Sequence, residues 1–324
     1  MKTLITGGAG FVGSHLATLL LERGREVHLL DDCSTGRKEN LDHIASHPRL
    51  HFHEGSVLDA RITGDLISGC DEIYHLAAAV GVRLVIEKPV ETIMTNVRGT
   101  EVVLENARRH GKKVLIASTS EIYGKNKNGS LREDDDRIMG SVMKQRWAYA
   151  NTKTLDEFLA LAYHRESGLP VVIARLFNTV GPRQTGRYGM VIPNFVRSAL
   201  DGKPIRVFGT GKQTRCFAYV GDVIEGLAAL MDHPGAVGQV FNVGNNDEIS
   251  IAELAGRVKA LTGSSSPIEL VPYEEAYGEG FEDMERRVPD LAKIHNLIGY
   301  KPKVQLDEIL ERVIDYFRAN RAAS

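Results

Sequence analysis

The sequence predicts an α/β protein with a doubly wound parallel β-sheet and a smaller C-terminal α/β lobe. Short apolar runs alternate with segments of helical periodicity through the first 180 residues. The first run leads into a glycine-rich turn, and after about residue 181 Gly and Pro punctuate the chain more densely. Strands that alternate with helices indicate βαβ units, whose parallel sheet is covered on both faces. We therefore expect one domain over residues 1–180 and mainly a second lobe over residues 181–324, with some segments returning to the first domain.

The expected strands of the first domain are short apolar runs, and they cover residues 2–6, 26–31, 50–54, 72–75, 113–118 and 170–176. The segments between them repeat apolar residues with the spacing of a helix. Those expected helices are residues 11–23, 90–110 and 147–167.

The C-terminal lobe mixes shorter elements in a less regular order. Its expected strands are residues 205–208, 240–243 and 268–271. Its expected helices are residues 190–200, 223–231, 251–261 and 306–319.

Composition limits the possible functions. The chain has 324 residues, enough for about two domains. It carries 40 Lys and Arg against 42 Asp and Glu, whereas nucleic-acid-binding proteins are usually basic, so we expect no nucleic-acid partner. No apolar run approaches the length of a membrane span, and the N-terminus lacks the pattern of a signal peptide. Three widely spaced cysteines (Cys33, Cys70 and Cys216) form no disulfide framework, so the expected location is a reducing cytoplasm.

The glycine-rich turn has the pattern and context of a dinucleotide site. Gly8, Gly10 and Gly13 fit G-x-G-x-x-G, and Gly7 extends the pattern on its N-terminal side. Such a turn lets a pyrophosphate approach the backbone, and the helix that follows offers unpaired N–H groups to the anion. Asp31 ends the second expected strand, near the offset of the acid that binds the adenosine ribose. Because this carboxylate would repel a 2′-phosphate, the sequence predicts a Rossmann-type fold that binds NAD.

An acid–base pair is expected on the helix over residues 147–167. Tyr149 and Lys153 are four residues apart and share one helix face. A phenol titrates near 10 and is a poor base at neutral pH, but a neighbouring ammonium together with a nicotinamide cation would lower its pKa. Tyr149 is then expected to take a proton from a sugar hydroxyl.

A third polar element follows the expected strand over residues 113–118. Thr119, Ser120 and Glu121 stand at the C-terminal end of that strand, where ligands bind in open α/β sheets. A hydroxyl there can bind the substrate oxygen that Tyr149 deprotonates, and Glu121 adds a second acid–base candidate.

These residues resemble the extended short-chain dehydrogenase/reductases that modify nucleotide sugars. The resemblance covers nearly the whole chain, and its segments agree in order and spacing. Besides the turn and the Tyr–Lys pair, it is carried by Asp59, HLAA (75–78), Asn96, RLFNTVGP (175–182) and QTRCFAYV (213–220).

The resemblance implies the roles of further residues. Those implied to hold the cofactor are Gly7, Gly10, Phe11, Val12, Gly13, Asp31, Asp59, Leu76, Ala77 and Lys153. Those implied to bind the nucleotide sugar are Asn178, Arg187, Arg215 and Arg287. Members oxidise the sugar at C4, act on the 4-keto intermediate and return the hydride, and most dimerise through the two long helices.

The resemblance leaves the reaction open among three outcomes. Glu121 in a Ser-Thr-Ser-Glu run and Arg287 in an Arg-x-Pro-Asp stretch are similar to UDP-glucuronate decarboxylases. The loop VGVR (80–83) departs from the xylose-forming decarboxylases, and GRYGMV (186–191) is closer to some UDP-sugar 4-epimerases. We favour decarboxylation of UDP-glucuronate, with 4-epimerisation as the alternative and 4,6-dehydration third.

Two other interpretations are less favoured. A non-catalytic NAD-binding protein would commonly have lost the Tyr, the Lys or the glycine turn, and this chain keeps all three. His51 and His53 alternate on an expected strand, but no Cys or acidic set completes a metal pattern. We expect hydrogen-bonded histidines and no metal.

Overall fold

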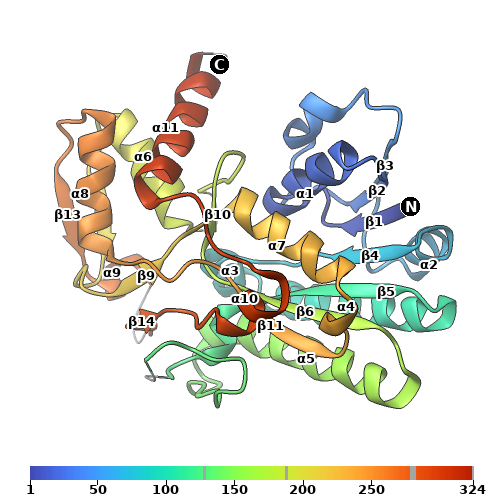
Figure 1. Ribbon diagram of the computed structural model, residues 1–324. Helices are drawn as coiled ribbons and strands as arrows, with labels where there is room; N and C mark the ends of the chain where they lie inside the picture. The colour runs from blue at the N-terminus through green and yellow to red at the C-terminus, as the bar shows by residue number, and fades with distance from the viewer. Residues whose placement is uncertain (127–128, 187–188, 278–281, 323–324) are drawn as a thin grey trace.

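The computed structural model describes residues 1–126, 129–186, 189–277 and 282–322 (Figure 1). A seven-stranded sheet lies at its centre, with strand order β11-β6-β5-β4-β1-β2-β3 and parallel pairing throughout. The order reverses at β1, which has β2 on one side and β4 on the other. Such a reversal opens a crevice at the C-terminal ends of the strands, which is where ligands bind in open α/β sheets.

The six strands predicted for the first domain are confirmed within one residue at their ends. They are β1 (Lys2–Thr6), β2 (Glu26–Asp31), β3 (Leu50–Glu54), β4 (Glu72–His75), β5 (Lys113–Thr119) and β6 (Val171–Leu176). The seventh, β11 (Gln239–Val243), comes from the C-terminal half and pairs with β6. The predicted strand over residues 240–243 is therefore a returning segment that completes the main sheet.

Helices cover both faces of this sheet, as expected for a parallel sheet (Figure 1). One apolar core joins one face to α1 (Phe11–Glu22), α7 (Val220–Asp232) and α10 (Ala292–Ile298). A second core joins the other face to α2 (Ala60–Gly69), α4 (Pro89–His110) and α5 (Ala148–Ser167). Both α4 and α5 end at a glycine in the left-handed conformation, Gly111 and Gly168, which stops each helix without a Cβ penalty.

A third core belongs to the smaller lobe, at the upper left of Figure 1. It is formed by α6 (Val191–Leu200), α8 (Ile251–Thr262) and α11 (Leu306–Ala322) around β8 (Ile205–Phe208), which pairs with β13 (Ile268–Val271). A reciprocal capping box between Ser250 and Glu253 starts α8, and Gly263 ends it.

Short strands join the two parts of the molecule. One small sheet has the order β12 (Glu248–Ser250), β9 (Thr214–Cys216), β14 (Arg286–Arg287), and another pairs β7 (Thr179–Val180) with β10 (Ala218–Tyr219). The remaining short helices are η1 (Lys38–Ile44), α3 (Val82–Glu87), η2 (Ser120–Tyr123), η3 (Gln145–Trp147), η4 (Pro234–Ala236) and α9 (Tyr273–Tyr277). Within the described ranges, no helix combines the length and the apolarity that a membrane crossing requires.

Candidate active site between the sheet and the smaller lobe

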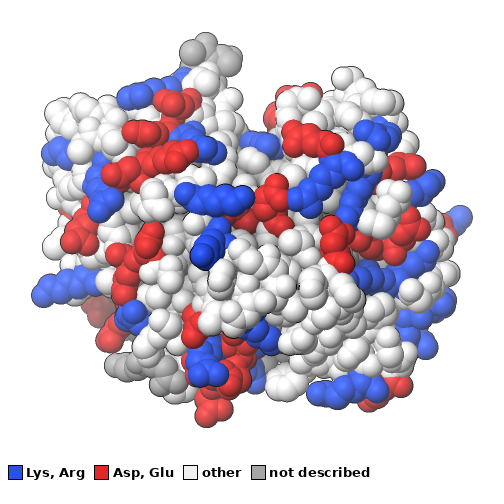
Figure 2. Space-filling model, in the orientation of Figure 1, with Lys and Arg blue, Asp and Glu red and all other residues white. Residues whose placement is uncertain are grey.

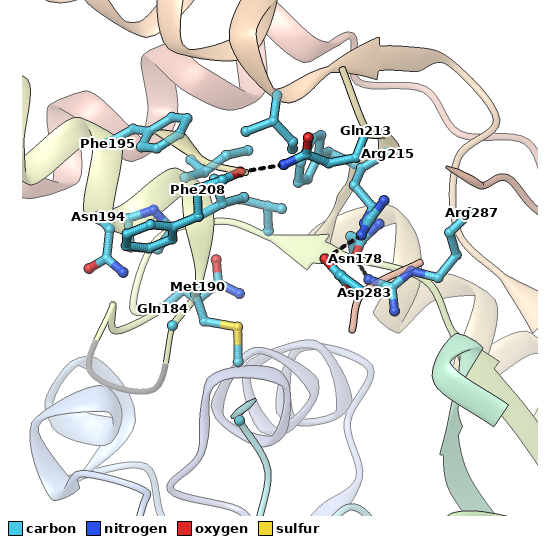
Figure 3. Close-up of a pocket in the computed structure, with 18 of the residues that line it drawn as sticks. Asn178, Gln184, Met190, Asn194, Phe195, Phe208, Gln213, Arg215, Asp283 and Arg287 are labelled. Carbon is cyan, nitrogen blue, oxygen red and sulfur yellow. Dashed lines mark hydrogen bonds and ion pairs between the residues drawn. The ribbon is translucent and has the colours of Figure 1, made fainter. Parts of the chain in front are cut away.

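A cavity of about 410 Å³ lies between the C-terminal ends of β5 and β6 and the smaller lobe (Figure 3). Five of the predicted site residues line it: Glu121, Tyr149, Asn178, Arg215 and Arg287. They come from η2, α5, the end of β6, β9 and β14. The structure thus brings together residues that span 167 positions of the chain.

Tyr149 and Lys153 stand one turn apart at the start of α5, as the spacing predicts. Tyr149 faces the cavity, while Lys153 is only 2% exposed. The Lys153 ammonium forms an ion pair with Asp156, at 2.8 Å between Nζ and Oδ2. Asp156 is also buried, so both charges of this pair are held away from solvent.

In the protein alone, the surroundings of Tyr149 act against the expected lowering of its pKa. Burial of the phenol raises its pKa above the ordinary value, and the carboxylates of Glu121 and Asp156 add to that rise. A hydrogen bond with Thr119 and the charge of Arg287 act in the opposite direction but are smaller. The predicted lowering also depends on the nicotinamide cation, so it stays a prediction. The pairing of Lys153 with Asp156 is a feature that spacing alone could not show.

The polar segment after β5 forms a tight turn beside Tyr149. Thr119 ends the strand, and its hydroxyl accepts a hydrogen bond from the Glu121 backbone N–H at 3.2 Å, which starts η2. The same hydroxyl contacts the Tyr149 phenol. Ser120 is almost fully buried beneath the turn, whereas Glu121 projects into the cavity.

Glu121 belongs to a buried network of three arginines and two acids. Its carboxylate pairs with Arg146 at 2.9 Å and with Arg287 at 3.5 Å. Asp283 pairs with Arg146 at 2.8 Å and with Arg215 at 2.9 Å (Figure 3). Three cations against two anions leave this end of the cavity with one surplus positive charge.

The network also fixes the protonation of its members. Burial would raise the pKa of Glu121, but Arg146 and Arg287 outweigh it and hold the pKa below its usual value. Burial, followed by the charge of Arg215, lowers the pKa of Arg287 to about 10. Glu121 is therefore a carboxylate at neutral pH, and it accepts hydrogen bonds rather than donating a proton.

Asn178 connects this network to the backbone of the lobe. Arg287 donates a hydrogen bond to the Asn178 side-chain oxygen at 2.6 Å, and Asn178 donates to the backbone carbonyl of Cys216 at 2.8 Å. The amide therefore fixes the Arg287 guanidinium at the cavity wall.

The opposite end of the cavity is apolar. Phe195, Phe208 and Phe217 line it, and the Gln213 side chain donates to the carbonyl of Phe208 at 2.8 Å. Figure 3 shows Phe195 and Phe208 on one side and the arginines on the other. A ligand with a flat ring at one end and negative charge at the other would match this distribution.

A second cavity, of about 790 Å³, runs along the C-terminal edge of β1, β2 and β4. Eight of the residues predicted to hold the cofactor line it: Gly7, Gly10, Phe11, Val12, Gly13, Asp31, Leu76 and Ala77. Val80, Gln184 and Met190 line both cavities, so the two meet.

The turn at this cavity fits a dinucleotide. Among the described residues no side chain caps the N-terminus of α1, so its first N–H groups remain available to an anion. A Cβ on Gly13 would lie 2.2 Å from the carbonyl oxygen of Gly7, which shows how closely helix and turn pack. Gly7 has a φ of 73°, a conformation that favours glycine.

The two predicted acidic contacts differ in their surroundings. Asp31 lines the cavity, and its carboxylate accepts from the backbone N–H groups of Ala9 and Cys33 at 2.9 and 2.8 Å. Asp59 instead caps α2 by accepting from the backbone N–H groups of Arg61 and Ile62. Its contact with the adenine remains a prediction, as does the contact of Lys153 with the cofactor.

The sequence did not predict Arg146 and Asp283. Arg146 lies three residues before Tyr149 on η3, with its side chain 5% exposed. The sequence did hold a signal for them, because both are charged residues close to predicted site residues. Asp283 is four residues before Arg287. Arg187 lies outside the described residues.

His51 and His53, set aside as metal ligands above, both contact His28 at the edge of the sheet. His28 and His53 are joined by a hydrogen bond of 3.2 Å between ring nitrogens. Glu26 Oε1 lies 3.2 Å from His28 and 3.5 Å from His51, and Lys2 approaches the same oxygen at 3.2 Å. Glu26, His28 and His51 thus bring three possible ligand atoms within 4.8 Å of one another, an acidic grouping that the sequence did not predict, and the absence of a metal stays a prediction.

Comparisons with known proteins place these observations in a family. Residues 4–313 match the family described as GDP-mannose 4,6 dehydratase. The chain is 43% identical to the UDP-N-acetyl-alpha-D-glucosaminuronate decarboxylase of Bacillus cytotoxicus, with 98% of each chain covered. It is 41% identical to UDP-glucuronic acid decarboxylase 1 of Arabidopsis thaliana, over 98% of this chain and 70% of that protein.

Two solved structures resemble this chain over nearly its whole length. The UDP-glucuronic acid 4-epimerase of Bacillus cereus, in complex with UDP-glucuronic acid and NAD, has a TM-score of 0.89 at 30% identity, with 99% and 100% of the two chains covered. The dTDP-glucose 4,6-dehydratase DesIV of Streptomyces venezuelae, with NAD and TYD bound, has a TM-score of 0.90 at 32% identity, with 100% and 98% covered.

Proposed function

Since the chain belongs to the GDP-mannose 4,6-dehydratase family of extended short-chain dehydrogenase/reductases, we propose that it is an NAD-dependent decarboxylase of a UDP-uronate. UDP-glucuronate is the first candidate substrate. The 43% identity to a decarboxylase of the 2-acetamido sugar makes UDP-N-acetylglucosaminuronate the second. The 4-epimerase interpretation is less well supported, because the relatives of 43% and 41% identity named above are decarboxylases.

The observation that carries this proposal is the buried network around Glu121. Its surplus positive charge suits a ligand with a diphosphate and a sugar carboxylate, which binds by charge-assisted hydrogen bonds. The aromatic side chains at the other end suit a flat base. Together they accommodate the two ends of a UDP-uronate.

The residues around the glycine turn are the ones that would hold NAD. When bound, NAD⁺ accepts the hydride from C4 of the sugar and later gives it back. Tyr149 takes the proton of the 4-hydroxyl, with Thr119 hydrogen-bonded to the same phenol. The 4-ketone then lies β to the C6 carboxylate.

Loss of CO₂ follows from that ketone. The C5–C6 bond breaks, its electron pair moves into the C4 carbonyl, and Tyr149 returns its proton to the enolate oxygen. Glu121, held as a carboxylate, keeps Arg146 and Arg287 in place beside the leaving group. The enol then takes a proton from water at C5 and gives its O–H proton back to Tyr149. Return of the hydride to C4, with that proton from Tyr149 to the oxygen, would complete the product.

We also propose a homodimer that works in the cytoplasm. Four apolar side chains on α4 and α5 are exposed, Val90, Ile93, Leu155 and Phe158, and the two helices pack side by side. A two-fold pairing of these helices would bury these four side chains.

The free thiols Cys33, Cys70 and Cys216 suit a reducing compartment. Basic and acidic side chains alternate over the face in Figure 2, without the basic surface typical of nucleic-acid binding.

The test is incubation of the purified protein with NAD⁺ and each UDP-uronate, followed by mass spectrometry. Loss of the mass of CO₂ is the expected result. A product of unchanged mass with inverted C4 stereochemistry by NMR would support 4-epimerisation instead. Tyr149→Phe serves as the inactive control.

A further inference from the structure

The carboxylate of Asp156 has no role in the reaction as described, yet it lies inside the catalytic helix. It is 1% exposed, and its Oδ2 is 2.8 Å from the Lys153 ammonium, which is 2% exposed. Its other oxygen, Oδ1, is buried and has no hydrogen-bond partner among the described residues. A carboxylate buried this deeply is costly unless it is paired, and Lys153 is the partner that offsets this cost.

The position of the pair on the helix makes the contact local and rigid. Lys153 and Asp156 are three residues apart, so they lie on one face of α5, and Tyr149 lies one turn earlier on the same face. The ammonium is therefore held by its own helix before any ligand arrives. A lysine without this partner could turn its full charge toward the phenol.

We propose that Asp156 is a positioning residue for the catalytic pair: it fixes the Lys153 ammonium and withholds part of its charge from Tyr149. This inference rests on the proposed function of the site. In this role, Asp156 helps to set the pH at which Tyr149 loses its proton and can act as a base.

The surroundings support this assignment. Asp156 is one of the two carboxylates that raise the Tyr149 pKa, the other being Glu121 on η2. Arg287, on β14, acts in the opposite direction. On the sheet side, His75 on β4 lies near Lys153, and its pKa falls to about 3 through burial and then the Lys153 charge, so it is neutral.

The other elements packed against this region add no unpaired charge among the described residues. Glu157 on α5 is paired with Arg175 on β6 at 2.8 Å. From α4, Asn96 bonds to Thr152 and Thr100 bonds to His75, and both are neutral. Asp156 is therefore the charge whose removal changes the balance around Lys153 most directly.

The test compares Asp156→Asn with two controls. Asn keeps the shape and an oxygen acceptor but removes the charge, whereas Asp156→Glu keeps the charge. Glu166→Gln removes an exposed carboxylate from the same helix. In Asp156→Asn, we expect the acid limb of the kcat/KM profile to move to lower pH by about one unit, since an unpaired ammonium favours the phenolate. Both controls should keep the wild-type limb.

A second measurement needs no sugar substrate. Ultraviolet absorbance of tyrosinate is titrated in the NAD-loaded protein, with Tyr149→Phe subtracted in each background. Tyr149 should ionise at lower pH in Asp156→Asn than in the wild type. If decarboxylation is never observed, this titration still decides the role of Asp156 independently of the proposed reaction.

Either readout can overturn the inference. An Asp156→Asn protein that folds, binds NAD and keeps the wild-type limb and the wild-type tyrosinate midpoint would show a structural role only. If that variant does not fold, Asp156→Ser is measured in its place with the same expected shift. Adding Lys153→Met should reduce the shift to the direct effect of the Asp156 charge on Tyr149, and a shift of full size without the lysine would contradict action through Lys153.

Discussion

Tyr149 is a phenol kept protonated by its surroundings until a positive group comes close. It is 9% exposed, and burial followed by two carboxylates raises its pKa. At neutral pH the phenol is therefore protonated in the resting site. Its activation depends on the positive charge that arrives with the oxidised cofactor, which links proton removal to the loaded state of the enzyme.

Replacing Tyr149 by Phe removes the proton acceptor and leaves the shape of the site. We expect kcat to fall about 10²- to 10⁴-fold, the usual contribution of general acid–base catalysis. NAD affinity, measured by calorimetry, should stay close to the wild-type value. A variant that keeps its turnover would remove Tyr149 from the chemistry.

Replacing Glu121 by Gln leaves Arg146 and Arg287 facing each other without their shared carboxylate. The side chains of the two arginines are 5% and 9% exposed, so solvent screens this repulsion poorly. We expect the free energy of unfolding to fall by about 2 kcal/mol, together with a loss of turnover. Denaturant titration measures the first effect.

The matched control is Glu248→Gln. Glu248 pairs with Arg286 at 2.8 Å, but both side chains are well exposed. Its loss should cost less than about 1 kcal/mol. Equal losses in the two variants would mean that burial of the Glu121 network has no energetic consequence.

At the scale of elements, the β1–α1 turn carries two glycines with different tasks. A Cβ on Gly13 would meet backbone atoms at 2.2 and 2.9 Å, whereas a Cβ on Gly10 meets its nearest atom at 3.1 Å. Gly10 has a φ of −70°, which any residue adopts, and it lines the larger cavity. Gly13 is thus needed for close packing between the helix and the turn, and Gly10 for the approach of a ligand to the backbone.

This difference predicts two distinct phenotypes. Gly13→Ala should lower the free energy of unfolding by about 1–3 kcal/mol, because the backbone must shift to admit the methyl group. Gly10→Ala should unfold like the wild type but bind NAD more weakly. Thermal unfolding and NAD calorimetry on both variants separate the two effects, and identical results would refute the distinction.

The long elements could be predicted from the sequence because their apolar pattern matches their burial. The predicted strands over residues 2–6 and 113–118 are β1 and, with one added residue, β5. The short strands β9 and β14 have two or three residues and no readable period, so pattern could not predict them. They nevertheless position Arg215 and Arg287, which were identified only through the family resemblance.

Other features depend on contacts that no local pattern encodes. The run 240–243 reads as a strand, but its partner β6 lies more than 60 residues earlier in the chain. Likewise, the spacing of Tyr149 and Lys153 predicted that they share one helix face, but it could not predict the ion pair between Lys153 and Asp156.

At the scale of the whole molecule, the proposed dimer depends on the exposed apolar side chains of α4 and α5. Phe158 is 55% exposed on α5. Phe158→Glu would place a charge at the proposed dimer interface, so we expect a monomer by light scattering after gel filtration. Leu270→Glu, at an equally exposed apolar site on β13 in the smaller lobe, should remain a dimer. A monomeric wild type would contradict the proposed assembly.

The return of β11 to the main sheet has a consequence for synthesis on the ribosome. Until residue 243 has emerged, β6 is an edge strand with unpaired backbone groups, and edge strands of this kind invite pairing with other chains. The nascent N-terminal domain therefore cannot complete its fold before α6 and β8 of the smaller lobe have been translated. A chain truncated near residue 180 should aggregate, whereas one that extends beyond β11 gains the strand that closes the edge.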